Sequence, residues 1–547
     1  MTQRMQGAPT VVLGEDAQRL RGQDARAHNV SAARAVAGAV ESTLGPRGLD
    51  KLLVDDLGEI TVTNDGATVL SGLTVDDPAA AMVVEVAQSQ ETAAGDGTTT
   101  AVTVAGALLE RAESLFEEGL HPTTVVRGFD EASELARDAL DDLAVPVDAG
   151  TGDANPGDAD PVLEHVAATA MTGTGADVDR AFLADLVVRA ARRTAVTADD
   201  GSVTVDRDAL DVRTEAGRPV GESELVGGAV VAEDPVHGTM PTAVDDASIL
   251  LLDRDIKTVE TDTEGTLVVN DPAMLRGFLQ REDDQLRELV DDLLVHDPDV
   301  IFCQNGIEEE VHEYLADQGV LAVRRVARDE IEFLADLLDT RLVGDFDSIT
   351  DDDLGRGAVT RDEAAGRFVV EGPGHGTTLF LRGASEQRVA ELERAVDDAL
   401  DVVAAVLADG RVLPGGGATE VELARRVRAG ADSVDGRERL AVEAFAAALE
   451  HVPRVLARNA GLSAVDALVD LRAAHDRGEA RAGLDVTTGG VVDAVEAGVV
   501  APVSVERGAV GAAAEAARHV LRIDDIVAAG DLSTTGDPEE RLPEGAL

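Results

Sequence analysis

The segment GDGTTT at residues 95–100 places one carboxylate, two glycines and three hydroxyls directly ahead of an apolar helical run. Glycines let the backbone approach a ligand closely, and a helix N-terminus offers unpaired N–H groups and the positive end of its dipole. Threonine hydroxyls add donors, and an aspartate supplies a hard oxygen ligand for magnesium. These residue types at this spacing indicate a cradle for phosphate and metal. For GDGT alone, a glycine turn with a Thr-rich helix cap is the alternative.

Three further glycine-containing segments accompany it: TLGPRG at residues 43–48, TNDGAT at residues 63–68 and LPGGGATEVELA at residues 413–424. Each on its own is an ordinary turn or helix start. In this order they resemble the nucleotide site of the group II chaperonins, the family of the archaeal thermosome and the eukaryotic cytosolic chaperonin. HPTTVVRGF, IFCQNGI, LFLRGASE and LRIDDIVAAG also keep the family order, so the resemblance covers about residues 30–530.

This resemblance implies that the chain binds ATP with magnesium, and with potassium as a further ion. It implies that Asp96 binds the magnesium and that Gly97 and the threonines after it bind the phosphates. It also implies that the turn around Gly416 contacts the base and sugar. The proline of TLGPRG would stiffen that turn. The implied nucleotide-binding residues are Gly45, Pro46, Gly97, Thr98, Thr99, Thr100, Gly415, Gly416 and Asp485.

Hydrolysis also needs a group that orients a water or takes its proton. The resemblance implies a catalytic acid in the helix EQRVAELERAVDDAL, at Asp398, with the neighbouring Asp397 as a rival in register. It implies a second acid at Asp65, in TNDGAT. In so acidic a chain, either carboxylate taken alone could equally be a solvated surface group. An acid on a hinged domain would couple domain closure to hydrolysis.

Four positions depart from the family pattern. Ala501 stands where an acid is usual, and Glu506 stands where a lysine follows it. In the loop AATAMTGTGAD, Thr174 replaces a lysine near the γ-phosphate and Ala170 replaces a serine. Loss of one charge-assisted contact weakens binding by roughly 1.5–3 kcal/mol. We therefore expect altered nucleotide sensing rather than lost catalysis.

The charge of the chain bears on its partners and its solvent. The 547 residues include 106 acids and 47 bases, a formal net charge of −59, and only Lys51 and Lys257 are lysines. Such a surface repels phosphate backbones, so nucleic acid is not an expected partner. Dispersed acids suit concentrated salt, where screening acts within about 3 Å at 1 M. We infer the cytoplasm of a haloarchaeon, with an acidic paralogue as the alternative.

The single cysteine and the apolar runs limit the compartment. Cys303 lies in the apolar stretch DVIFCQNG, which predicts a small buried side chain rather than a nucleophile. A chain poor in cysteine fits a reducing compartment. The N-terminus has no apolar leader region, and no window approaches 18 apolar residues. We therefore expect neither secretion nor a membrane partner.

Hydrophobic periodicity predicts a mainly helical part, an α/β part and a second helical part. The fold class expected is multidomain α+β: a helical equatorial domain, a small α/β intermediate domain and an α/β apical domain with a helical lid. The resemblance implies these domain bounds: residues 1–145 and 404–530 equatorial, 146–216 and 371–403 intermediate, 217–370 apical, and 531–547 a disordered tail. The lid would lie within about residues 240–280, with an apolar stripe at Met274, Leu275, Phe278 and Leu279.

The leading interpretation is an ATP-dependent protein-folding chaperone subunit. Its partners would be unfolded protein clients, and copies of itself or paralogous subunits in two stacked rings. One alternative is a structural ring subunit with impaired nucleotide sensing. A small-molecule phosphotransferase that uses GDGTTT is another, although the split helical halves around an α/β insertion argue against it.

Overall fold

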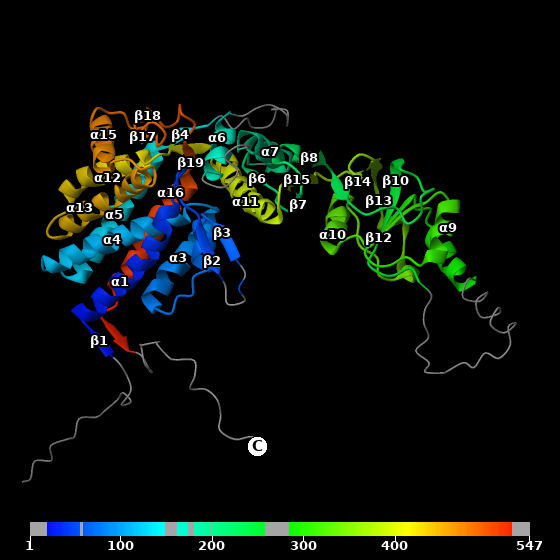
Figure 1. The fold of residues 1–547 in the computed structure, drawn as a ribbon, viewed down its shortest axis with the longest axis horizontal. Coiled ribbons are helices and arrows are strands. Elements are labelled where there is room, and N and C mark those ends of the chain that lie inside the picture. Colours follow the sequence, from blue (N-terminus) through cyan, green and yellow to red (C-terminus); the bar gives the residue numbers. More distant parts are fainter. Residues whose placement is uncertain are drawn as a thin grey trace, which may run out of the picture. The chain divides into compact units, whose positions relative to one another are not determined.

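The computed structural model describes residues 19–54, 58, 60–147, 161–172, 180–198, 200–257 and 284–527. The chain forms two compact units. The first takes Met1–Val147, Thr172–Thr174 and Arg411–Leu547, and the second takes Asp148–Met171 and Gly175–Gly410. Figure 1 shows the first unit drawing its elements from both ends of the chain, blue to cyan and yellow to red.

Helices dominate the first unit. Its helices are α1 (Gln23–Val40), α2 (Gly66–Ser71), α3 (Pro78–Ala94), α4 (Thr98–Glu117), α5 (Pro122–Leu143), α12 (Ala418–Gly430), α13 (Glu438–Leu449), α14 (His451–Asn459), α15 (Ala464–Asp476) and α16 (Val503–Leu521). Side chains cap some of them, such as Asp65 at α2, Asp77 at α3 and Ser463 at α15. Proline opens α3 and α5 at the first turn, where its missing N–H costs nothing. The apolar periodicity predicted these helices correctly.

Small residues allow the helices of the two chain halves to pack closely. A Cβ added at Gly128 of α5 would lie 2.5 Å from the Cβ of Ala441 in α13. In the same interface, Phe129 of α5 and Phe445 of α13 meet edge to face with ring centroids 5.9 Å apart. Residues about 310 positions apart in the sequence thus share one core, which is built mainly of Ala, Val and Leu.

Short strands edge the first unit. β1 (Arg19–Arg21) pairs with β20 (Asp525–Val527), and β2 (Lys51–Val54) pairs with β3 (Ile60–Thr63) in the hairpin expected around Gly58. β4 (Val145–Pro146), β16 (Arg411–Pro414) and β19 (Val500–Pro502) form a three-stranded sheet, and β17 (Ala482–Leu484) pairs with β18 (Val491–Asp493). The sheet of β4, β16 and β19 joins segments from both halves of the chain.

The second unit contains two larger sheets. The six-stranded sheet has the order β12 (Leu321–Arg324), β11 (Val300–Cys303), β10 (Ala243–Leu252), β13 (Leu354–Asp362), β14 (Arg367–Glu371) and β9 (Ala229–Val231). The three-stranded sheet has the order β7 (Leu210–Ala216), β15 (Thr377–Gly383) and β8 (Glu224–Gly227). β5 (Ala195–Thr197) and β6 (Val203–Val205) form a hairpin. The short apolar runs SILLLD, DVIFCQNG, VLAVRRV and GTLVVN predict strands. The first three are confirmed, and GTLVVN lies outside the described residues.

The helices of the second unit are α6 (Pro161–Ala170), α7 (Arg180–Arg193), α9 (Glu309–Asp317), α10 (Arg328–Leu337) and α11 (Glu386–Asp409), with a further helical segment at residues 284–294. The side chain of Ser385 caps α11 by accepting a hydrogen bond from the N–H of Arg388 at 3.3 Å. Cys303 is buried as expected, and burial raises the pKa of its thiol to about 11. The predicted lid stripe and the predicted tail lie outside the described residues.

Among the residues that the structure describes, no helix is long and apolar enough to cross a membrane. The multidomain α+β fold class is confirmed: helices and sheets combine in the arrangement predicted.

Guanidinium forks from α12 and α15 meet at one buried carboxylate between α13 and α14 of the first unit. Glu450 lies between α13 and α14 and is almost fully buried. Arg428 of α12 donates to both of its oxygens, at 2.7 and 2.5 Å, and Arg472 of α15 does the same from another side. The paired hydrogen bonds hold the pKa of Glu450 below its usual value although burial raises it.

Replacing this carboxylate by an amide should destabilise the fold, because two guanidinium groups lose their buried counter-charge. For Glu450→Gln we expect a loss of about 3 kcal/mol in the free energy of unfolding. Glu443→Gln, which removes a half-exposed carboxylate of α13 paired with Arg439, should cost less than about 1 kcal/mol. Urea titration in concentrated potassium chloride, followed by circular dichroism, measures both. Equal losses for the two variants would contradict the proposed role of the forks.

Candidate functional site

The GDGTTT segment forms a tight turn between two helices. Gly95 ends α3 in the left-handed conformation, with φ of 66°, and Gly97 precedes α4 with φ of 86°. Only glycine adopts such angles without strain. The side-chain amide of Gln90 donates to the carbonyl of Asp96 at 2.9 Å and to that of Val505 at 3.3 Å. This amide therefore joins the turn to the first turn of α16.

Asp96 lies at this turn and has its carboxylate set into the protein. Its Oδ1 accepts the N–H of Gly97 at 2.5 Å. Burial raises the pKa of Asp96 above its usual value, the hydrogen bond from Gly97 lowers it, and the nearby charge of Asp65 raises it further. A bound cation would relieve this unfavourable burial of negative charge.

The TNDGAT segment packs directly against the start of α4. Asp65 caps α2, because its carboxylate accepts the N–H groups of Ala67 at 3.3 Å and Thr68 at 2.7 Å. A Cβ added at Gly66 would lie 2.0 Å from Oγ1 of Thr99, so the two segments touch without room for a methyl group. The structure therefore brings Asp65 and Asp96 together, as the sequence predicted.

The three threonines of the segment are not equivalent. The buried hydroxyl of Thr98 donates to the carboxylate of Glu91 at 2.6 Å, so it serves the packing of α3 against α4. Thr99 and Thr100 are partly exposed at the N-terminus of α4. These two hydroxyls, together with the unpaired N–H groups of the first turn, are placed to receive an anion.

The TLGPRG loop is fixed by α14. The side-chain amide of Asn459 donates to the carbonyls of Glu41 at 3.0 Å and Leu44 at 2.9 Å. A Cβ at Gly45, whose φ is 82°, would lie 2.4 Å from Cδ2 of Leu456. Pro46 follows it, partly exposed. The loop thus rests on the last turns of α14.

The triple-glycine turn rests on the same helix. The N–H of Gly415 donates to the carbonyl of Val499 at 2.8 Å, and the carbonyl of Gly416 accepts the N–H of Leu484 at 2.9 Å. A Cβ at Gly417 would lie 2.6 Å from Cβ of Pro453, one turn before Leu456. Because Gly45 and Gly417 contact residues one turn apart on α14, the two glycine segments are neighbours.

Asp485 follows the strand that contacts Gly416, and its carboxylate is already engaged. It accepts the N–H of Thr487 at 2.8 Å and the hydroxyl of Thr488 at 2.6 Å. The hydroxyl and the backbone N–H groups lower the pKa of Asp485. It therefore orders the loop between β17 and β18 beside the triple-glycine turn.

Two acids lie next to this site: Glu420, which the sequence analysis did not single out, and Glu506, which it identified only as a departure from the family pattern. Glu420 lies in the first turn of α12, three residues after Gly417, and burial raises its pKa to about 7. Glu506 lies in the first turn of α16, and burial and the charges of Glu420 and Asp96 raise its pKa well above the usual value. Oε2 of Glu506 is buried with no hydrogen-bond partner among the described residues. The sequence did carry one signal for Glu420, because it is an acid three residues after the triple glycine, in the first turn of the helix that follows.

The second catalytic candidate lies in the other unit. Asp398 is on α11, and its rival Asp397 pairs with Arg207 at 2.9 Å on the same unit. Ala170 ends α6, whereas Thr174 lies outside the described residues. Ala501 is on β19, paired with Leu413 just before the triple-glycine turn, so this departure does lie near the site.

The donor set fits magnesium bound together with a phosphate. Among the described residues, no group of three or more His, Cys, Asp or Glu side chains is arranged to hold a metal ion. Magnesium, however, is usually held by one or two carboxylates and completes its octahedron with waters and substrate phosphates. Asp96 at the N-terminus of α4 meets that need, and the helix start would face the phosphates.

A helical unit assembled from both ends of the chain, with glycine-rich turns at its helix starts and a sheet-containing unit between its two halves in the sequence, is the architecture of a chaperonin subunit. Residues 36–531 match the TCP-1/cpn60 chaperonin family. The chain belongs to this family.

The relatives are archaeal thermosome subunits. The chain is 53% identical over 544 residues to Thermosome subunit 2 of Haloferax volcanii, covering 99% of this chain and 96% of that protein. It is 50% identical to Thermosome subunit beta of Halobacterium salinarum, with 97% and 95% covered, and 44% identical to the Thermosome subunit of Methanopyrus kandleri, with 96% of each covered. The recognised family, the folding function and ATPase activity are thereby confirmed: the chain is a group II chaperonin subunit that hydrolyses ATP in protein folding. Nothing favours the alternative of a nucleotide-impaired structural subunit.

The contact between Gly66 and Thr99 gives a direct test of the site. The Cβ of Gly66→Ala would displace the Thr99 hydroxyl or move α2, so we expect ATP hydrolysis to fall by about 10–100-fold with the fold retained. Gly38→Ala in α1, where a Cβ meets nothing within 4 Å, is the matched control and should keep full activity. Steady-state phosphate release measures both. Full activity of Gly66→Ala would show that this contact does not shape the site.

Proposed function

We propose that the glycine-rich site of the first unit binds ATP with magnesium. The observation that supports this is the meeting of TNDGAT, GDGTTT and the first turns of α12 and α16 around Asp96. In this proposal Asp96 holds the magnesium, which neutralises charge on the phosphates. Thr99, Thr100 and the N–H groups of α4 hold the phosphates, and the positions implied by resemblance at Gly45, Pro46 and Gly97 shape the backbone around them. Thr98 supports α4 from behind.

The base and sugar belong to the triple-glycine turn. Gly415 and Gly416 would contact them, and Asp485 would act by ordering the loop beside Gly416. The hydrogen bond from Leu484 to Gly416 supports this assignment, because it fixes the turn against β17. Potassium is proposed as a further ion beside Glu420 and Glu506, because burial raises the pKa of both acids and a bound cation would favour their ionised forms.

The domain assignment is also a proposal. Residues 1–145 and 404–530 form the equatorial ATP-binding domain, 146–216 and 371–403 the intermediate hinge, and 217–370 the apical client-binding domain with its lid. The split of the chain into two compact units, the second with two separate sheets, supports this division. Unfolded protein clients would bind the apical domain, in the cytoplasm of a haloarchaeon.

In the proposed mechanism, Asp398 orients the attacking water or accepts its proton, and Asp65 assists from the first unit. Asp398 is carried by a different unit from the phosphate site, which supports a coupling of hydrolysis to domain movement. Closure would assemble the complete site, and loss of phosphate would release it. Asp65 has a second task, because its carboxylate caps α2.

The four departures are proposed to tune nucleotide sensing. Thr174 and Ala170 replace a lysine and a serine of the family pattern, and Ala501 replaces an acid near the triple-glycine turn. Glu506 reverses the charge of the usual lysine and faces Asp96 and Glu420. With Asp65, Asp96 and Asp398 present, we propose that catalysis is retained and that affinity for ATP depends more strongly on cations.

The chain is proposed to assemble with copies of itself and with paralogous subunits into two stacked rings. The β2–β3 hairpin supports such contacts, because one of its faces is apolar and exposed. Leu52 pairs with Val62 and Val54 pairs with Ile60 across the strands, and the four side chains are 47–65% exposed. An isolated hairpin is marginal in water, so an exposed apolar face of this kind is expected to be covered by another chain.

The test of the catalytic assignment is magnesium-dependent ATP hydrolysis in multimolar potassium chloride, for the unmodified protein and for Asp398→Ala. Loss of the group that orients water should reduce the hydrolysis rate by at least about 100-fold, with ATP binding retained. Asp397→Ala is the matched control: it breaks the ion pair with Arg207 and should keep most of the rate. Loss of activity only in Asp397→Ala would move the catalytic role to that residue.

The hairpin makes a separate prediction about assembly. Leu52→Asp places a charge in the centre of the apolar face, and we expect sedimentation velocity to show smaller particles than for the unmodified chain. Val295→Asp changes a side chain that is 74% exposed on the second unit, and should leave the particle intact. Unchanged particles for Leu52→Asp would exclude the hairpin from the subunit contact.

A further inference from the structure

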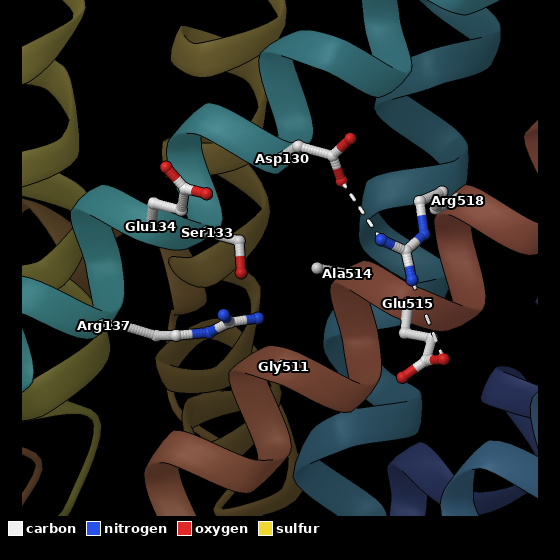
Figure 2. A pocket seen from close by; sticks show the side chains of 8 residues that line it. All are labelled: Asp130, Ser133, Glu134, Arg137, Gly511, Ala514, Glu515 and Arg518. Atoms are coloured by element: carbon white, nitrogen blue, oxygen red, sulfur yellow. Dashed lines mark ion pairs between the residues drawn. The ribbon is translucent and has the colours of Figure 1, made fainter.

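A polar hollow of about 400 Å³ lies between α5 and α16 of the first unit (Figure 2). It is on the second half of α16, beyond the first turn that carries Glu506. Its volume falls within the range of about 300–1,000 Å³ that is typical of small-molecule sites. The hollow is therefore separate from the proposed ATP site and large enough for a ligand.

The wall formed by α5 presents two polar groups without partners. Ser133 is 3% exposed, and its hydroxyl is buried with no hydrogen-bond partner among the described residues. A buried hydroxyl without a partner costs free energy, so it indicates a ligand or a water. Arg137, one turn further along, forms no ion pair with any residue that the structure describes. Figure 2 shows the Ser133 hydroxyl and the Arg137 guanidinium both directed into the hollow.

The wall formed by α16 adds a second guanidinium. Arg518 lies 3.6 Å from Oδ1 of Asp130 and 3.7 Å from Oε1 of Glu515. Both distances exceed hydrogen-bonding range, so these pairs hold Arg518 in place and leave its N–H groups available. Figure 2 shows Arg518 and Arg137 entering the hollow from opposite sides.

The remaining lining leaves space between the two arginines. Gly511 of α16 has no side chain, and a Cβ built on it would lie 3.8 Å from Nη2 of Arg137. Glu134 is exposed on the rim, and in Figure 2 its carboxylate points away from both guanidinium groups. Asp130 and Glu515 together exceed the single charge of Arg518, and both lie on its side of the hollow. Arg137 has no ion-pair partner among the described residues, so it is the guanidinium left to receive an anion.

We propose that this hollow binds an anionic group of the carboxylate or phosphate class, held between Arg137 and Arg518 with the Ser133 hydroxyl donating to it. Guanidinium groups match the oxygens of both classes and form paired, charge-assisted hydrogen bonds with them. Two sources carry this chemistry: a free anion in solution, or an acidic side chain of a neighbouring subunit. The proposal stands apart from the ATP site and does not depend on it.

The experiment uses inorganic phosphate as the probe of the intact particle. Calorimetric titrations compare phosphate with chloride at matched potassium concentration and ionic strength, with ADP saturating the nucleotide site. Arg137→Gln removes the charge of the unpaired guanidinium. Gly511→Leu fills the hollow without changing its charge, and leucine favours a helix more than glycine does. Arg127→Gln, on the same helix but paired with Glu438, is the matched control.

For a free anion we expect one phosphate per chain, with affinity at least about tenfold weaker in Arg137→Gln and Gly511→Leu and unchanged in Arg127→Gln. For an acidic side chain of a neighbour, sedimentation velocity should show smaller particles for the same two variants only, and phosphate should compete with assembly. Either result supports the site. Absence of both effects, with Arg137→Gln behaving as Arg127→Gln does, would overturn the proposal.

Discussion

The architecture of the first unit depends on backbone contacts too close for any side chain. A Cβ at Gly66, Gly45 or Gly417 would lie 2.0 to 2.6 Å from atoms of Thr99, Leu456 and Pro453 respectively. In the sequence, Gly45 and Gly66 lie before the second unit and Gly417 lies after it. Each contact holds one loop against a helix: Gly66 lies against the start of α4, whereas Gly45 and Gly417 lie against α14. At Gly66 the small size of glycine is what matters, because its backbone conformation is ordinary, whereas Gly45 and Gly417 also have the positive φ angles that favour glycine.

A second constraint follows from the charge of the chain, which must fold despite an excess of 59 negative charges. With only two lysines, its structural cations are almost all guanidinium groups, which bind carboxylates through paired hydrogen bonds. Glu450 receives two such forks in the first unit, and Arg382 joins Glu215 and Glu224 in the second. Glu420 and Glu506, the buried acids beside the proposed phosphate site, receive no such fork from any residue that the structure describes. In concentrated salt, the solvent can supply cations to them.

The sequence predicted the motifs of the site better than their chemical surroundings. Local signals identified TNDGAT and GDGTTT as glycine turns at helix starts. It was the resemblance to the chaperonin family that implied they belong to one site. Glu420 escaped notice because its burial depends on the packing of α12, which is decided by segments about 70 to 300 residues away. The sequence likewise did not indicate that the hydroxyl of Thr98, a proposed phosphate-binding residue, donates to Glu91 on the preceding helix. Composition and periodicity gave the helices and strands, whereas the pairing of buried polar groups required the three-dimensional structure.

Helix α16 connects two features that the chain keeps apart in sequence. Its first turn carries Glu506 and the Val505 carbonyl bonded to Gln90, while its second half lines the hollow with Arg518 and Gly511. A helix moves as a rigid body, because its backbone hydrogen bonds are internal. Any shift of α16 caused by filling the phosphate site would therefore change the spacing between Arg518 and Arg137 on α5. An anion held between these two arginines would resist that shift, so occupancy of the hollow and of the nucleotide site would be thermodynamically linked.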